Sequence, residues 1–349
     1  MGIETSCDET AAAVVEGGQH MLSNVVASSL DLHTAYGGVV PEVAARSHVE
    51  AIIPVIKQAL DLASCSWSDI DAISVTEGPG LAGSLLIGVV TAKSLAATLN
   101  KPLYAINHVE AHIYANFITL ANDKSYRLPA KPPSLPLLAL IVSGGHSHLV
   151  YLKDHGDYQV IGRTLDDAVG EAFDKVAKML GLPYPGGPSI AKAAENGNQD
   201  AYILPKAHLA GKYDFSFSGL KTAVLRTAQR VAGKDFTLPS HLLPELLTDQ
   251  QKADIAASFQ SVALETLVDV LEKAVQDYRP TSVVIGGGVA ANQSLRQLVK
   301  KRLKTGVDYT DVRLCTDNGA MIAALGYYKL QKTTPSDPYS LDIDPSLSM

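Results

Sequence analysis

Apolar and polar positions follow two periods along the chain, and these predict a series of strands and helices. Short apolar runs bounded by glycine or polar turns predict strands. These runs lie at residues 2–5, 11–15, 21–28, 72–76, 102–106, 137–142, 149–153, 158–163 and 281–285. Apolar residues that recur every three or four positions predict helices. The predicted helices cover residues 41–62, 85–99, 167–180, 249–278 and 291–303.

The order of the predicted elements occurs twice. Residues 2–28 and residues 137–163 each predict a hairpin with a small polar tip and then a third strand, and a helix follows both. A segment at 122–136 with four prolines separates the two halves. Strands that alternate with helices indicate an α/β fold, and the repeat indicates a structural duplication with two lobes.

The domain boundaries follow from this repeat. We expect lobe I at residues 1–106 plus 318–335, and lobe II at residues 107–317. Residues 181–244 are rich in glycine, proline and serine, so their pattern predicts no definite elements. Residues 336–349 are rich in proline, serine and aspartate and are expected to form a frayed, flexible tail.

The composition fits two α/β domains of ordinary size. Of 349 residues, 46% are hydrophobic and 19% are charged. No apolar run approaches the roughly 20 residues that span a bilayer, and the first residues resemble neither a signal nor a transit peptide. We therefore expect a cytoplasmic protein without membrane contact. The three cysteines are widely spaced and are expected to be reduced thiols.

Three loops of small residues are candidates for binding phosphate. Two are the hairpin tips at residues 6–10 and 143–147, and the third is the turn of Gly286, Gly287 and Gly288 before a helix. Small residues let backbone N–H groups approach phosphate oxygens, although one such loop alone is usually only a turn. The combination is typical of the two-lobed, ribonuclease H-like ATPase fold of actin, sugar kinases and heat-shock ATPases, which binds a nucleotide in a central cleft. Neither a Walker A loop nor a Rossmann GxGxxG fingerprint is present.

Two histidines mark a candidate metal site. Asn107 can cap a helix that carries His108 and His112 one turn apart, so both imidazoles can face one divalent ion. The same spacing also fits two structural histidines at a helix start, and two imidazoles alone make a weak site. A carboxylate from elsewhere is therefore required. Glu110 lies on another face of the helix than the zincin glutamate does, which disfavours a metalloprotease.

The ordered motifs of the chain resemble the bacterial tRNA N6-adenosine threonylcarbamoyltransferase family, formerly named O-sialoglycoprotein endopeptidase. The resemblance extends from Gly2 to about Gly326. Relatives usually carry a few more apolar residues before the first motif, so we expect either that the first strand is short or that the true start of the chain lies upstream of Met1. The matching motifs are GIETSCDET (2–10), GGVVPEVAAR (37–46), EGPGLAGSLLIG (77–88), NHVEAH (107–112), IVSGGHS (141–147), DDAVGEAFDK (166–175), YPGGP (184–188), FSFSGLKTAV (215–224), GGVAAN (287–292) and CTDNGAM (315–321).

This resemblance implies a set of site residues. His108, His112 and Asp317 match the family's metal ligands, and this donor set suits either Fe(II) or Zn. Other positions match residues that bind an adenylate substrate. These are Ile141, Val142, Ser143, Gly144, Gly145, Asp174, Gly187 and Asn292.

The implied reaction moves a threonylcarbamoyl group from threonylcarbamoyl-AMP to N6 of the adenosine beside the anticodon, in tRNAs that read codons starting with A. AMP is the leaving group. Because an exocyclic adenine amine is a poor nucleophile, the enzyme must align it with the carbonyl and help remove a proton. Asp8 and Glu9 lie at the first hairpin tip and are the candidate catalytic carboxylates, with Asp8 favoured. The alternative is an aspartate that only forms the turn.

The resemblance also implies partners: tRNA, a smaller paralogous actin-like subunit and a P-loop ATPase subunit. Lys175, Lys221 and the basic run of Lys300, Lys301, Arg302 and Lys304 are candidates for tRNA phosphate contacts. The net charge of −7 argues mildly against them, and such a run is usually a solvated helix face.

Three other classes of function stay open beside the transferase. An actin-like small-molecule kinase would use the same loops but has no evident need for the His pair. A non-catalytic nucleotide-binding subunit and the old peptidase assignment are the others.

Overall fold

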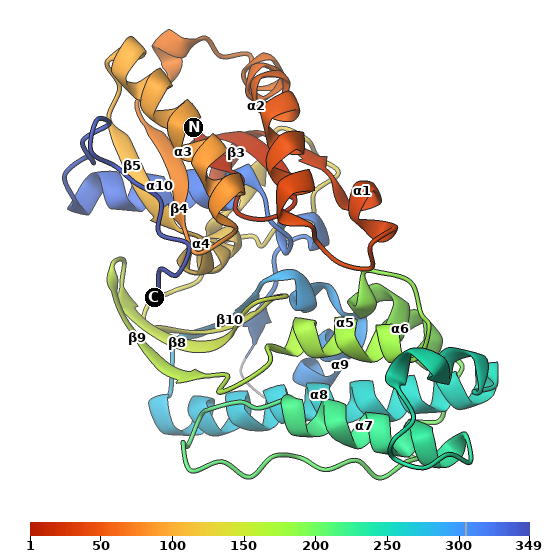
Figure 1. Cartoon of the computed structure of the whole chain (residues 1–349). Helices are drawn as coiled ribbons and strands as arrows, with labels where there is room; N and C mark the ends of the chain where they lie inside the picture. Colours follow the sequence, from red (N-terminus) through yellow and green to blue (C-terminus); the bar gives the residue numbers. More distant parts are fainter. Residues whose placement is uncertain (304–305) are drawn as a thin grey trace.

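The computed structural model describes residues 1–303 and 306–349, and it has two lobes, each built on one mixed sheet (Figure 1). The first sheet has the strand order β5-β4-β1-β2-β3-β6, and the second has the order β11-β10-β7-β8-β9. The strands of the first sheet are β1 (Gly2–Glu4), β2 (Glu9–Glu16), β3 (His20–Ser28), β4 (Ile73–Gly78), β5 (Leu103–Asn107) and β6 (Leu120–Ala121). Those of the second are β7 (Leu137–Val142), β8 (Ser147–Asp154), β9 (Asp157–Arg163), β10 (Ser282–Gly286) and β11 (Val307–Asp308).

The two sheets share one topology. In each, the first three strands are antiparallel neighbours, the fourth pairs in parallel with the first, and the fifth pairs in parallel with the fourth. The registers place Ile3 opposite Ala12 in the first sheet and Leu138 opposite Tyr151 in the second. The structure therefore confirms the duplication that the sequence predicts.

Helices cover both sheets. The α-helices are α1 (Leu30–Thr34), α2 (Pro41–Ala63), α3 (Ala82–Leu99), α4 (His108–Tyr114), α5 (Val169–Met179), α6 (Gly186–Ala194), α7 (Ser218–Val231), α8 (Asp249–Tyr278), α9 (Gln293–Arg302) and α10 (Gly319–Lys332). Short 3-10 turns lie at Trp67–Asp69, Ala115–Phe117, Ser240–Glu245, Gly288–Ala291 and Val312–Leu314. Helices α2 and α3 pack on one face of the first sheet, and α10 returns from the end of the chain to pack on the other.

Period-two alternation decides which core each strand residue joins. Leu138 and Leu140 of β7 face α5, α7 and α8 in lobe II. Leu137, Ala139 and Ile141 face the opposite way, into a core that α4 and α10 share between the two sheets. Helix α4, which carries the histidine pair, is thus held between the lobes.

The predicted bounds of helices and strands differ from those in the structure mainly next to turns. Helix α3 begins at Ala82 rather than residue 85, and its Gly83 lies where a Cβ would be 3.1 Å from the Ala45 side chain of α2. Helices α6 and α7 lie in the region for which the sequence predicts no elements. The first strand is three residues long, as expected.

The residues after Thr333 are bonded to lobe I. Backbone N–H groups of Ser336 and Asp344 donate to the carbonyls of Leu103 and Glu77 at 2.8 Å each. Leu341 and Ile343 pack against the core under α2 and α3. Backbone hydrogen bonds and two partly buried apolar side chains thus attach this segment to lobe I despite its polar composition, whereas the sequence predicts a frayed tail.

One described helix, α3, is long and apolar enough to cross a bilayer by length and composition alone. Glycine and serine interrupt the apolar runs of this helix, so no long apolar run marks it in the sequence. Core helices of soluble proteins meet the same criterion, and α3 packs on α2 and β4, so it is weak evidence for a membrane segment.

Candidate active site

The histidine pair lies on a capped helix. The Asn107 side chain accepts hydrogen bonds from the N–H groups of Val109 (2.9 Å) and Glu110 (3.1 Å), so it caps α4 as predicted. The rings of His108 and His112 lie one turn apart with centroids separated by 4.8 Å. Glu110 is buried away from them, beside Tyr114 and α10, and this supports the case against a zincin-type peptidase.

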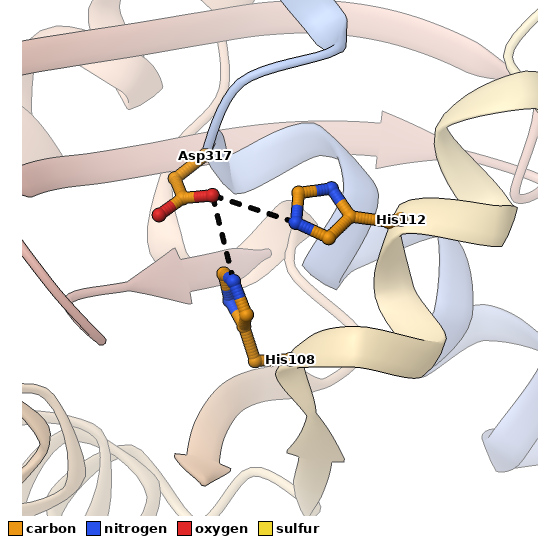
Figure 2. A group of neighbouring side chains, drawn as sticks. All are labelled: His108, His112 and Asp317. Carbon is orange, nitrogen blue, oxygen red and sulfur yellow. Dashed lines mark ion pairs between the residues drawn. The ribbon is translucent and has the colours of Figure 1, made fainter. Parts of the chain in front are cut away.

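Asp317 completes a three-ligand cluster with these histidines. Its Oδ1 lies 3.5 Å from Nε2 of His108 and 3.5 Å from Nε2 of His112 (Figure 2). The three candidate ligand atoms lie within 4.8 Å of one another. Asn318 fixes the turn, because its side chain accepts from the Met321 N–H and donates to the Thr316 carbonyl. Two imidazoles and one carboxylate in this arrangement could hold a divalent cation with open positions.

His112 is suited to be a ligand. Both ring nitrogens are buried without a hydrogen-bond partner among the described residues. Burial, together with the charge of His108, holds the pKa of His112 well below its ordinary value, so the ring is neutral at pH 7 and one of its nitrogens has a free lone pair. An orphaned buried imidazole is costly, and a bound cation would satisfy it.

Glu4 orients His108 and was missed in the sequence analysis. Its Oε2 lies 3.1 Å from Nδ1 of His108 and accepts a 2.6 Å hydrogen bond from the Thr76 hydroxyl, while the Ser6 N–H donates to Oε1. Burial alone would raise the pKa of Glu4, but the His108 charge and these hydrogen bonds lower it to about 2. Carboxylates behind metal-bound histidines fix the ring orientation in this way. The only signal in the sequence is a glutamate at the end of a buried strand.

The hairpin tip of lobe I brings Asp8 and Glu9 next to this cluster. Burial, followed by the charges of Asp317 and Asp8, raises the pKa of Glu9 to about 9. Burial also raises the pKa of Asp317, to about 6, with Glu4 and Asp8 contributing. The tip, the metal cluster and Glu4 therefore form one acidic site around the two histidines.

The candidate adenylate positions lie across from this tip in lobe II. Ile141 and Val142 have fully buried side chains, so only their backbone can face a ligand. Ser143 accepts from the His146 N–H at 3.2 Å, which shapes the turn. At Gly144 and Gly145 no atom lies within 4 Å of where a Cβ would be, so the backbone at this tip is open to a ligand.

The other three positions lie in the middle of α5 and at the starts of α6 and α9. Asp174 of α5 accepts from the Gly186 N–H at 2.7 Å, which fixes the start of α6, and Gly187 beside it has open space. Asn292 caps α9 by accepting from the Leu295 N–H at 3.1 Å. Binding of substrate by these eight residues stays a prediction.

The basic side chains suggested for tRNA are largely paired with acids. Lys175 and Lys221 bind the Asp167 carboxylate at 2.8 and 2.6 Å. Arg302 pairs with Asp269 at 2.7 Å and also with a second acid of α8. Such pairing argues against these three as phosphate contacts. Lys300 and Lys301 are exposed at the end of α9, and Lys304 lies outside the described residues.

Comparisons with known proteins identify the family of the chain. The family model described as TsaD, tRNA N6-adenosine threonylcarbamoyltransferase, matches residues 20–324. A relative of that name from Thermomicrobium roseum is 51% identical and covers 99% of this chain and 94% of its own. The relative from Bacillus subtilis is 50% identical and covers 95% and 90%.

Solved structures confirm the duplicated actin-like fold. HypF of T. kodakarensis has a TM-score of 0.56 at 14% identity, covering 95% of this chain and 49% of its own. A full-length HypF in a phosphate- and nucleotide-bound form has a TM-score of 0.53 at 13% identity. Since the family model and the curated relatives both extend over nearly the whole chain, the chain belongs to the TsaD family of tRNA N6-adenosine threonylcarbamoyltransferases.

Proposed function

We propose that this transferase moves the threonylcarbamoyl group of threonylcarbamoyl-AMP to N6 of the adenosine next to the anticodon, in tRNAs that read codons starting with A. The observation that carries the proposal is the cluster of His108, His112 and Asp317 beside an acidic hairpin tip. The open glycine tip of Gly144 and Gly145 in the other lobe supports an adenylate site facing it. A small-molecule kinase would leave the metal cluster without a role.

The chemistry requires a base and an aligned carbonyl. N6 of the adenosine attacks the carbamoyl carbon, the bond from that carbon to the phosphate oxygen breaks, and AMP leaves with the electron pair. The proton on N6 must pass to a base. Because the raised pKa of Glu9 keeps it protonated at neutral pH, Asp8 is the carboxylate that accepts this proton.

A divalent ion, Fe(II) or Zn, would be held by His108, His112 and Asp317, and it would supply positive charge to orient or polarise the transferred group. Elemental analysis of the purified protein tests this. About one equivalent of Fe or Zn is expected in the wild type and little in His112→Ala. Equal metal content in both proteins would refute the site.

Transfer itself is tested with purified protein, threonylcarbamoyl-AMP and unmodified tRNA, with and without a chelator. Mass spectrometry of the digested tRNA should show modified adenosine, with less after metal removal. An absence of product even with partner subunits added would favour a non-catalytic subunit.

Lobe I has an apolar face suited to a partner, for which we propose the smaller paralogous actin-like subunit. Val49 and Ile53 of α2 are 59% and 62% exposed, and Leu86 and Val90 of α3 are 46% and 50% exposed. Helices α2 and α3 pack against each other (Figure 1), with Ala45 beside Gly83. The four residues follow these two positions by about one and two turns along their helices.

Size-exclusion chromatography of the protein mixed with the smaller subunit tests whether this apolar face binds that subunit. Ile53→Asp should prevent co-elution. Ile203→Asp, a change at a fully exposed apolar residue of lobe II, should not. We also propose that a P-loop ATPase subunit is a further partner and that the protein is cytoplasmic.

A further inference from the structure

Two buried histidines of lobe I lie behind the hairpin tip without belonging to the metal cluster. His33 follows the third strand in α1, and His48 lies in α2; both side chains are fully buried. Each connects to the backbone of the tip. His33 does so through Ser29, whose hydroxyl and backbone N–H both donate to the Asp8 carbonyl, at 2.8 and 3.0 Å.

The direction of every hydrogen bond through His33 follows from donor and acceptor chemistry. The Val40 N–H can only donate, and it points at Nδ1 of His33 at 3.3 Å, so Nδ1 carries no proton. The proton of the neutral ring is then on Nε2, which donates to the Ser29 oxygen at 3.1 Å. The Ser29 hydroxyl must in turn donate to the Asp8 carbonyl, which is an acceptor only.

His48 holds the neighbouring residue of the tip in a fixed position. Its Nε2 donates to the Cys7 carbonyl at 3.0 Å, so its Nδ1 accepts the Thr10 hydroxyl at 2.8 Å. The Ser84 hydroxyl donates to the same Cys7 carbonyl at 3.1 Å. Burial lowers the pKa of His48 and so favours the neutral ring that this arrangement needs. The residue before Asp8 is therefore anchored independently of His33.

The other end of the His33 chain reaches lobe II. Val40 ends the loop after α1, and Gly37 of this loop lines a cavity of about 240 Å³ together with Asp174 and Tyr184 of lobe II. In Figure 1 this loop extends from lobe I toward α5 and α6. One unbroken chain of hydrogen bonds thus joins a loop at the boundary of the lobes to the backbone of Asp8.

We propose that Ser29 and His33 are positioning residues that hold Asp8 in place for proton transfer. Through them, the position of Asp8 depends on the position of the loop at residues 35–40. The inference rests on the proposed function, because it assumes that Asp8 accepts the N6 proton. Both side chains are buried, so their proposed role is to act through Asp8 rather than on the substrate directly. Their effect is on the position of Asp8, so they act on the chemical step rather than on binding of the adenylate.

The test compares three hydroxyl variants in steady-state transfer assays with threonylcarbamoyl-AMP and tRNA. Ser29→Ala should lower kcat by about 10- to 100-fold with little change in KM for the adenylate. Ser29→Thr keeps the hydroxyl and should recover most of this loss. Thr34→Ala removes a hydroxyl of the same helix that bonds only to the Leu30 carbonyl, and it should match wild type. The proposal would be wrong if Ser29→Ala kept the wild-type kcat. It would also be wrong if kcat fell in Ser29→Ala and Ser29→Thr did not restore it.

Hydrogen exchange of the free protein separates this inference from the proposed function. Ser29→Ala should speed amide exchange in peptides that cover residues 7–10 and 35–40, whether or not the protein transfers anything. If exchange is faster in Ser29→Ala but the wild type transfers nothing, the proposed function is refuted and the hydrogen-bond chain from Val40 to Asp8 is still supported. If exchange is unchanged in Ser29→Ala and the wild type is active, only the role of this hydrogen-bond chain is refuted.

Discussion

Glu4 and His108 face each other at 3.1 Å across the end of the first strand, and the other nitrogen of His108 points at Asp317. The ring is therefore fixed from behind by a buried carboxylate, with Nε2 left for a metal. Glu4→Gln keeps the shape of the side chain but weakens this hold. We expect metal affinity, measured by competition with a chromophoric chelator, to fall by about 10- to 100-fold. Glu16→Gln, a change at an exposed acid, is the control, and an equal affinity in both variants would contradict the role of Glu4.

Asp8 and Glu9 should respond differently to replacement by the corresponding amide. Asp8→Asn removes the proposed base, and single-turnover transfer should slow by about 100-fold or more. Glu9 is already protonated at neutral pH, since its pKa is raised to about 9, so the neutral amide of Glu9→Gln imitates it. That variant should stay within about tenfold of wild type. Wild-type transfer by Asp8→Asn would exclude Asp8 as the base.

Asp311 should contribute pH-dependent stability. Burial opposes its charge, but hydrogen bonds from Arg313 and from the Arg127 N–H outweigh burial and lower its pKa to about 2 from 3.8. A depressed pKa means that the ionised form is stabilised in the folded state. The contribution is therefore complete above the unfolded value and is lost as pH falls through about 2.

Urea denaturation checks this sign. At pH 7, Asp311→Asn should lower the free energy of unfolding by about 1–2 kcal/mol, because the exposed Arg313 partner weakens the effect. The difference from wild type should shrink from about pH 4 downward. A difference that grows on acidification would contradict the assignment.

Gly319 should tolerate no side chain. It begins α10, and a Cβ there would lie 2.6 Å from the backbone of Ala12 in β2. Gly319→Ala should lower the free energy of unfolding by about 1–3 kcal/mol or more. Gly219 begins α7 in open space, so Gly219→Ala should be neutral or stabilising by up to about 1 kcal/mol. Thermal unfolding of both variants provides the comparison, and equal melting temperatures would be the contrary result.

Local signals in the sequence suffice for elements with clear period and caps. Helix α8 has the predicted bounds, since a capping box of Thr248 and Gln251 marks its start. Asn107 likewise marks the start of the histidine helix. Helices α6 and α7 were not predicted because prolines and glycines surround them, and the two-residue strands β6 and β11 exist only through their neighbours in the sheets.

The site could be predicted only in part for the same reason. The spacing of His108 and His112 follows from helix geometry, but Asp317 entered through resemblance alone. Glu4 lies 104 residues before His108, and no local pattern links the two. The pairing of Lys175 and Lys221 with Asp167 could not be predicted, because it depends on how α5 and α7 pack. Tertiary proximity decides these contacts.

Because α10 packs on the first sheet from the end of the chain, it affects the order in which the two lobes can fold during synthesis. As the chain leaves the ribosome, the strands of lobe I emerge first, yet one face of their sheet stays bare until residues 319–332 appear. Lobe II has all its strands and helices before that point and can fold earlier, the reverse of the usual order from the N-terminus. Asp317 emerges just ahead of α10, so the three residues of the proposed metal cluster come together only after the strands and helices of lobe II have emerged.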